Sequence, residues 1–369
     1  MLGIPHVRTS ERKDFKRCQQ RWVWNWRQGL VPRIEKPGAL WFGIGIHLAL
    51  QHRYSKPGLA RGVNVLKVWR EYAGDTQAVI YGDNYSEDKE DFYDAVELGE
   101  QMLGNYLDFY GKDPRWHVVS AEQTFELPIP YPRRHPSTGE WLCYYNGTFD
   151  LVARDLEGDE SLWLWDHKTA KAISTKHLAL DDQAGSYWAV AGDVLSHLGL
   201  ISPGDKLDGI LYNFLRKGKA DERPVNANGL RTNKPVKAHY EAALREAGIV
   251  SVGTLKALQE RAEAAQITVL GDESKQQPPP LFHREVVWRT RSERRTQIER
   301  IQNEALQMSA LRSRVFAPTK NPTTDCSWDC KFFELCQLHE AGDDWREYRD
   351  AAFVRRDPYA DHRKSADAD

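Results

Sequence analysis

The sequence of 369 residues lacks any apolar run that approaches the ~18 residues of a membrane-spanning helix. Residues 1–15 contain no apolar segment of the kind found in secretory signals, so we expect a cytoplasmic protein without a membrane partner. An excess of charge of one sign is also missing, because 51 Lys and Arg residues face 53 Asp and Glu residues. The net charge of −2 excludes a globally basic nucleic-acid binder, but it is compatible with a basic groove on a balanced surface.

Cysteine is scarce and unevenly spaced. Cys18 and Cys143 stand alone, whereas Cys326, Cys330 and Cys336 lie close together. An odd number of cysteines in a chain without a signal peptide argues against a disulfide scaffold and favours a metal or cluster site. Cys143 lies inside a strand-like segment and is most simply a core residue.

The remaining composition is that of a globular protein, with 41% hydrophobic and 28% charged residues. Helical patterns come first, and we expect helices over 9–29 and 38–54 and in parts of 60–112. Strand-like segments follow at 117–129, 142–155, 161–170 and 209–217, with one helix over 176–199. This order predicts a mixed α/β or α+β core.

Composition and periodicity divide the sequence into five predicted regions. They are an N-terminal helical region at 1–116, the core at 117–217, an insertion or linker at 218–283 that ends in "GDESKQQPPP", a helix and cysteine cluster at 284–340, and a tail at 341–369 whose last part, 355–369, we expect to be disordered.

An acidic pattern lies at the ends of two neighbouring strand-like segments. Asp166 and Lys168, in "LWLWDHKTA", point to one face of a strand and His167 to the other, and Asp150 ends "NGTFD" in the preceding strand. The turn "LEGDE" predicts a hairpin that brings Asp150 and Asp166 together. Two such carboxylates favour Mg²⁺ or Mn²⁺, and Lys168 could ready a water or offset charge on a phosphate. The alternatives are turn or cap acids and a plain ion pair.

The segments "GTFD", "WDHKT" and "QAGSY" resemble the G-x-x-D, (D/E)-x-K and Q-x-x-x-Y motifs of the PD-(D/E)XK nuclease superfamily. The resemblance is closest to its RecB-like branch, which includes CRISPR-associated exonucleases and many phage exonucleases. It implies a restriction-endonuclease-like mixed central sheet flanked by helices, and a metal-dependent DNA nuclease.

The resemblance also implies a role for each residue that matches a family motif. The metal ligands are His47 (in "GIGIH"), Asp150, Asp166 and the backbone carbonyl of His167; Lys168 activates water; Gln183 and Tyr187 orient the site or the DNA strand; Glu122 corresponds to a glutamate on the first core strand. A core or helix-face histidine is the alternative for His47, an ordinary helix face for Gln183 and Tyr187, and an exposed strand residue for Glu122.

The segment "DCSWDCKFFELC" is one thiolate short of a complete four-cysteine site, and Cys18 is the natural fourth ligand. The arrangement resembles RecB-like exonucleases that hold an iron–sulfur cluster, although the family spacing has one residue fewer between the first two cysteines. The resemblance implies a [4Fe–4S] cluster on Cys18, Cys326, Cys330 and Cys336 that joins the N- and C-terminal segments. Zn²⁺ and unpaired thiols are the alternatives.

The resemblance implies an exonuclease that acts on single-stranded or duplex DNA ends in recombination, repair or phage DNA processing. The sequence has no helicase P-loop, so a helicase or recombination partner would supply any unwinding. The alternatives are a catalytically silent iron–sulfur module and a CRISPR adaptation-type nuclease that trims ends. The arginine-rich stretch at 283–300 is either a track for phosphates or a solvated helix face.

Overall fold

The computed structural model describes residues 4–33, 37–54, 64–81, 88–133 and 140–360. The chain divides into two compact units, Gly218–Leu281 and the remainder, and each is described by itself. Among the described residues, no helix combines the length and the apolar character needed to cross a membrane.

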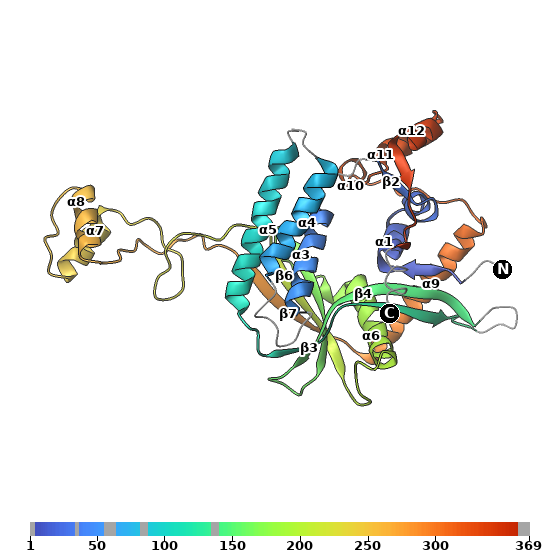
Figure 1. The fold of residues 1–369 in the computed structure, drawn as a ribbon, viewed down its shortest axis with the longest axis horizontal. Helices are drawn as coiled ribbons and strands as arrows, with labels where there is room; N and C mark the ends of the chain where they lie inside the picture. Colours follow the sequence, from blue (N-terminus) through green and yellow to red (C-terminus); the bar gives the residue numbers. More distant parts are fainter. Residues whose placement is uncertain (1–3, 34–36, 55–63, 82–87, 134–139, 361–369) are drawn as a thin grey trace. The chain divides into compact units, whose positions relative to one another are not determined.

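The larger unit is built on a six-stranded mixed sheet (Figure 1). Its strands are β1 (His6–Arg8), β3 (Trp116–Pro130), β4 (Trp141–Asp155), β5 (Leu162–Ala170), β6 (Leu207–Arg216) and β7 (Phe282–Trp288). The order is β1-β4-β5-β6-β7, and β3 pairs with β4. β1–β4 and β5–β6 are parallel and the other pairs are antiparallel. The predicted mixed sheet flanked by helices is therefore confirmed.

Helices cover the sheet on both sides. The helices are α3 (Ala39–Tyr54), α4 (Val65–Ile80), α5 (Asp88–Tyr110), α6 (Asp182–His197) and α9 (Arg291–Arg312). The first three lie side by side (Figure 1), and the Tyr54 ring of α3 contacts Trp165 and His167 of β5. Leu164, which points to the opposite face of β5, joins a core cluster with residues of α6 and α9.

The N-terminal segment differs from the single helix predicted over 9–29. It forms α1 (Thr9–Arg17), α2 (Gln19–Trp22) and a π-helical turn (Val23–Arg27), because Cys18 is extended with φ −165° and ψ 117°. A short strand, β2 (Leu30–Pro32), follows.

The region predicted as a tail, 341–369, begins with regular elements, and the segment predicted to be disordered, 355–369, starts at the last residue of one of them. α10 (Cys326–Asp329) and α11 (Phe333–Ala341) are followed by α12 (Trp345–Ala352) and β8 (Phe353–Arg355), and β8 pairs with β2. Phe353 is buried in a small core with Trp24 and Phe332, which explains the order. Residues 361–369 lie outside the described part of the chain.

The smaller unit contains two helices, α7 (Lys237–Glu246) and α8 (Leu255–Ala264). Leu244, Leu258 and Ala262 form its own core. The predicted insertion, 218–283, extends two residues too far, because Phe282 and His283 pair with Leu215 and Phe214 in the core sheet.

Candidate metal centre and active site

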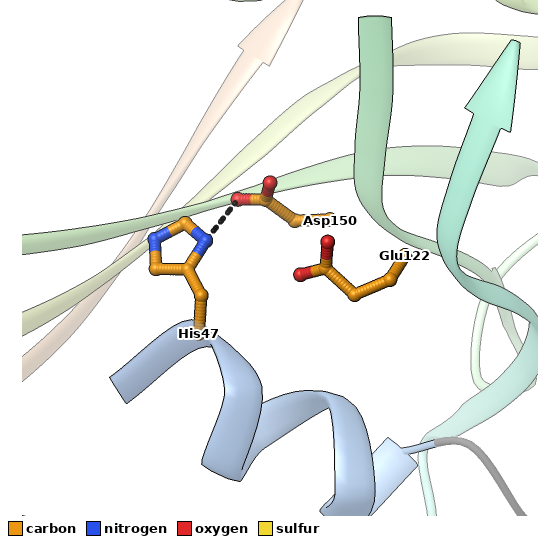
Figure 2. Close-up of side chains that lie close together, drawn as sticks. All are labelled: His47, Glu122 and Asp150. Carbon is orange, nitrogen blue, oxygen red and sulfur yellow. Dashed lines mark ion pairs between the residues drawn. The ribbon is translucent and has the colours of Figure 1, made fainter. Parts of the chain in front are cut away.

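Three side chains that can bind a metal gather where α3 meets the central strands. His47 comes from α3, Glu122 from β3 and Asp150 from β4 (Figure 2). One ligand atom from each lies within 4.8 Å of the other two. Residues that are far apart in the sequence thus supply one imidazole nitrogen and two carboxylates to a single point.

Glu122 reaches this point through an irregularity in β3. Its φ is +48°, a left-handed conformation that non-glycine residues adopt at a cost of about 1–3 kcal/mol. Ladder pairing with β4 is recorded for Ala121 and Gln123 on either side, but not for Glu122. Its Oε1 is buried and accepts no hydrogen bond in the described part of the chain. A buried carboxylate oxygen without a donor favours a cation beside it.

His47 lies between Asp150 and the end of β5. Its Nδ1 is 3.5 Å from Asp150 Oδ2, and its Nε2 is 2.9 Å from the His167 carbonyl oxygen. Burial lowers the pKa of His47, but the charges of Asp150 and Glu122 outweigh burial and raise it to about 9. Burial likewise raises the pKa of Asp150, and the charge of His47 reverses this and brings it to about 2. The protonated ring therefore offsets the acids in this structure.

Asp166 and Lys168 form a pair next to this group. Lys168 Nζ lies 3.0 and 2.8 Å from the two carboxylate oxygens of Asp166. Burial and the neighbouring Asp150 raise the pKa of Asp166 to about 6, although Lys168 opposes them. The sequence predicts Asp166 as a metal ligand together with His47 and Asp150. In the structure, the third residue whose ligand atom joins those two is Glu122.

His167 contributes its backbone rather than its ring. The ring is buried and its Nδ1 lies 3.0 Å from the side-chain amide of Asn213. Burial lowers the pKa of His167 to about 3, so the ring is neutral. The backbone N–H donates to Asp150 at 2.7 Å, while the carbonyl faces His47. The backbone at the end of β5 therefore holds both Asp150 and His47 in position.

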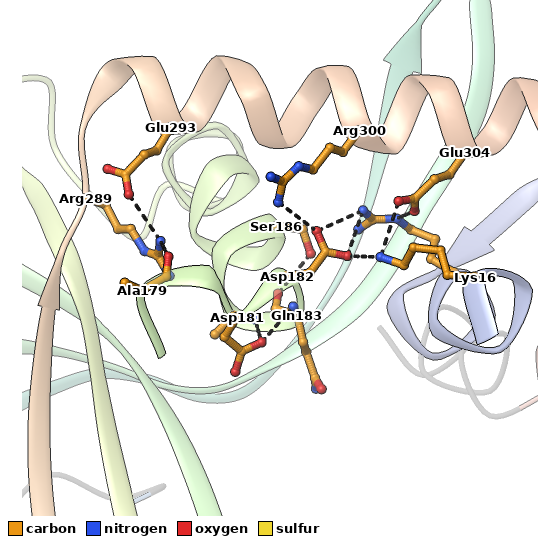
Figure 3. Close-up of polar contacts among 12 residues, drawn as sticks. Lys16, Ala179, Asp181, Asp182, Gln183, Ser186, Arg289, Glu293, Arg300 and Glu304 are labelled. Atoms are coloured by element: carbon orange, nitrogen blue, oxygen red, sulfur yellow. Dashed lines mark hydrogen bonds and ion pairs between the residues drawn. The ribbon is translucent and has the colours of Figure 1, made fainter. Parts of the chain in front are cut away.

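Gln183 and Tyr187 lie on the first turns of α6 and differ in their surroundings. The Gln183 side chain is exposed, and Figure 3 shows it pointing away from α9. The Tyr187 ring packs against Phe125 and Phe149, and burial raises its pKa. A Cβ atom on Gly147 would lie 2.7 Å from both Phe125 and Tyr187, so the motif glycine makes room for this tyrosine.

A comparison with protein-family models matches residues 9–337 to the PD-(D/E)XK nuclease superfamily. The chain belongs to this superfamily. A comparison with curated proteins found no match. PD-(D/E)XK nucleases use divalent metals such as Mg²⁺, and the imidazole, carboxylate and carbonyl donors at this site fit such an ion.

One residue near the PD-(D/E)XK site was missed by the motif reasoning. Asp181 caps α6 by accepting hydrogen bonds from the N–H groups of Gln183 and Ala184, and its other oxygen lies 3.9 Å from Lys168 Nζ. An acid directly before an apolar helical pattern is a cap signal, which could have identified it from the sequence. Asp181 and Asp166 together hold the ammonium of Lys168 from two sides.

The start of α6 is also anchored by ion pairs to the N-terminal helix α1. Asp182 accepts from Arg12 at 3.2 Å and pairs with Lys16, and Arg12 also donates to Glu304 of α9 at 2.5 Å. Arg300 of α9 lies 3.8 Å from Asp182 (Figure 3). The Arg12 side chain has no exposed surface, so α1, α6 and α9 share one buried cation.

Metal binding at this PD-(D/E)XK centre is expected to release protons. A ligand must be unprotonated, whereas a pKa of about 9 keeps His47 protonated at neutral pH. The affinity for Mn²⁺ should therefore rise as the pH increases from 6 towards 9. Calorimetry in two buffers with different ionisation enthalpies measures the release. His47→Gln should lower the number of protons released and the exposed His52→Gln should not, and equal enthalpies in both buffers would contradict the assignment.

Two arginines of the proposed phosphate track are structural instead. Arg284 is bidentate to Asp113 and lies 3.7 Å from the ring centroid of Tyr110 and 4.5 Å from that of Trp165. Arg289 is 2% exposed and donates to backbone carbonyls. Both side chains are used to hold the sheet against its helices, so neither is available to track phosphates.

Replacing Arg284 with alanine should lower the free energy of unfolding by about 3–5 kcal/mol, because the Asp113 side chain, which is only 11% exposed, is left without its partner. Urea denaturation followed by tryptophan fluorescence measures the change. Arg291→Ala is the matched control, since Arg291 is exposed at the start of α9. If Arg284→Ala has the same urea midpoint as the wild type, the Arg284–Asp113 pair contributes nothing to stability.

Cys18, Cys326, Cys330 and Cys336 lie in the N- and C-terminal segments that the β2–β8 pairing brings together, and none of them forms a disulfide. Cys143 is fully buried, which confirms its predicted place in the core. Burial raises the pKa of Cys336, and the charges of Cys18, Cys330 and Cys326 raise it further. In the described part of the chain, no three of these four sulfurs lie within 4.8 Å of one another.

Proposed function

We propose that this protein is a Mg²⁺- or Mn²⁺-dependent exonuclease that hydrolyses phosphodiester bonds at DNA ends. The observation that carries the proposal is the buried oxygen of Glu122, beside Asp150 and His47, for which the described residues offer no hydrogen-bond donor. An acid cluster of this kind is stabilised by a divalent cation, and the neighbouring Lys168 adds a positive charge for a phosphate.

In this proposal His47, Glu122 and Asp150 hold the ion, with the His167 carbonyl in reach. The bound ion would act as a Lewis acid and make an attacking hydroxide available at neutral pH. The assignment of Asp166 as a further ligand stays a prediction; in this structure it positions Lys168.

Lys168 is assigned to the phosphate rather than to removal of a proton from water. Burial lowers the pKa of its amine, but the charges of Asp166 and Asp181 outweigh burial and raise it. The ammonium form is therefore favoured, and it can donate hydrogen bonds to a phosphate oxygen that gains charge.

The remaining assignments rest on the resemblance to the RecB-like branch. Gln183 and Tyr187 orient the site or the DNA strand, and the exposed side chain of Gln183 is accessible to a strand. The pathway is recombination, repair or phage DNA processing in the cytoplasm, with a helicase or recombination protein as partner.

The test uses end-labelled linear DNA and covalently closed circular DNA, each incubated with the protein and Mg²⁺ or Mn²⁺. An exonuclease shortens linear strands progressively and leaves closed circles intact, and EDTA stops the reaction. Equal loss of circular and linear DNA would contradict an end-dependent activity. No cleavage of either substrate with either metal would reject the nuclease proposal.

We further propose a [4Fe–4S] cluster on Cys18, Cys326, Cys330 and Cys336. Four thiolates suit such a cluster, and a Zn²⁺ site is the alternative. Cys330 and Cys336 border the small core of Trp24 and Phe332, so a cluster would join the two ends of the chain. A cluster that joins Cys18 to Cys326 would close the chain between them into a loop. By the loop-entropy relation, the lost entropy of the unfolded chain corresponds to about 5 kcal/mol.

Protein purified without oxygen is expected to be brown and to contain about four iron atoms for each chain. Cys330→Ser should lose the colour and unfold at a lower temperature, while Cys143→Ala should keep the colour. A colourless protein with one zinc ion for each chain would reject the iron–sulfur cluster in favour of the alternative.

A further inference from the structure

A pocket of about 410 Å³ lies beside the three-residue metal group. One wall is a face of α3, with Leu40, Ile44, His47 and Leu48, and Glu122 of β3 closes the pocket. The near end of the pocket is therefore part of the candidate metal centre, whereas the far end is aliphatic.

The aliphatic end of the pocket is unusually open to solvent. Leu40 is 74% exposed and Ile44 is 51% exposed, and their spacing of four residues places them on the same helix face. Another face of α3 is packed tightly, because a Cβ atom on Gly45 would lie 2.5 Å from Trp69 and 2.6 Å from Tyr72 of α4. Exposed aliphatic side chains next to a charged centre indicate a ligand with an apolar part and a charged part.

We propose that this pocket binds the bases of an unpaired DNA strand, with Leu40 and Ile44 against the bases that neighbour the cleaved phosphate. The inference rests on the proposed nuclease function and specifies its substrate. With a helical rise of 1.5 Å, Ile44 is about 4.5 Å and Leu40 about 10.5 Å from His47 along the axis. Both residues are therefore within reach of the first few nucleotides of a strand that ends at the metal centre.

The chemistry of the wall determines which DNA it accepts. Leucine and isoleucine offer no hydrogen-bond donors or acceptors, so they contact any base without reading its sequence. In a duplex the faces of the bases are stacked and covered, so only an unpaired strand can present them. The same pocket is lined by His47 and Glu122 of the candidate metal centre. An occupant that reaches this centre is therefore more simply a nucleic acid than a protein.

The experiment compares the wild type with the double variant Leu40→Ala, Ile44→Ala on a single-stranded oligonucleotide and on the same strand with abasic sites near the cleaved end. We expect the double substitution to raise KM about ten-fold, with a smaller change in kcat. Abasic sites should raise the wild-type KM to a similar extent and add little in the variant. Leu156→Ala, a leucine 51% exposed on the β4–β5 turn, is the matched control.

The outcomes separate this inference from the proposed function. Equal wild-type KM values for the intact and abasic strands would overturn the base-binding pocket and leave the nuclease intact. If the wild type cuts no DNA, fluorescence anisotropy without divalent metal decides: weaker binding of the abasic strand supports the pocket, and equal binding rejects it. A double variant that changes only the self-association of the protein in light scattering would also overturn the inference.

Discussion

Lys168→Ala is expected to lower the rate of phosphodiester cleavage by roughly 10³-fold, because it removes the ammonium that Asp166 and Asp181 hold beside the candidate metal ligands. The measurement is a time course on end-labelled single-stranded DNA with Mn²⁺. Binding of Mn²⁺ should persist in the variant, since the amine is not one of the gathered ligand atoms.

Lys112→Ala provides the matched control for this change. Lys112 is exposed in the turn after α5, and its replacement should leave cleavage within about two-fold of the wild type. If Lys168→Ala cleaves as fast as the control, the observed nuclease is a contaminant or the active site lies elsewhere.

Asp150→Asn is expected to reduce cleavage at least as much and to weaken Mn²⁺ binding by about 100-fold or more. The amide keeps the size of the carboxylate and can still accept from the His167 N–H, so the fold is preserved. It loses the negative charge that a divalent cation requires. Isothermal calorimetry gives the affinity and circular dichroism reports on the fold.

Asp108→Asn is the control, because Asp108 is exposed on α5. Unchanged Mn²⁺ affinity in Asp150→Asn would mean that the three-residue group is not the metal site, even if cleavage were lost. Glu122→Gln then distinguishes a ligand set with Glu122 from one with Asp166. A large loss of Mn²⁺ affinity supports Glu122 as the ligand, whereas wild-type Mn²⁺ affinity supports Asp166.

Much of the sheet could be predicted from the sequence because its strands are apolar, bounded by clear turns and joined in order. The hairpin of β4 and β5 followed from "LEGDE", and its pairing of Leu151 with Trp165 brings Asp150 and Asp166 to neighbouring positions. Local patterns determine such pairs, so the acids and Lys168 could be found without a structure.

The role of Glu122 was harder to predict, because a left-handed residue inside a strand leaves no signal in the residue types. The same holds for Arg284, whose partner Asp113 is far away in the sequence and belongs to a turn. β8 is only three residues long and is stabilised by its pairing with β2, so local composition could not distinguish it from a tail.

The smaller unit is inserted between two strands that are neighbours in the sheet, since Leu215 of β6 pairs with Phe282 of β7. Its two ends therefore occupy the place of a hairpin connection. The entropic penalty of closing a loop grows only with the logarithm of its length, by ~0.6 kcal/mol for each doubling. Descendants of this gene can thus lengthen, exchange or delete the segment while the central sheet keeps its register, which makes this edge a tolerant site for acquiring new modules.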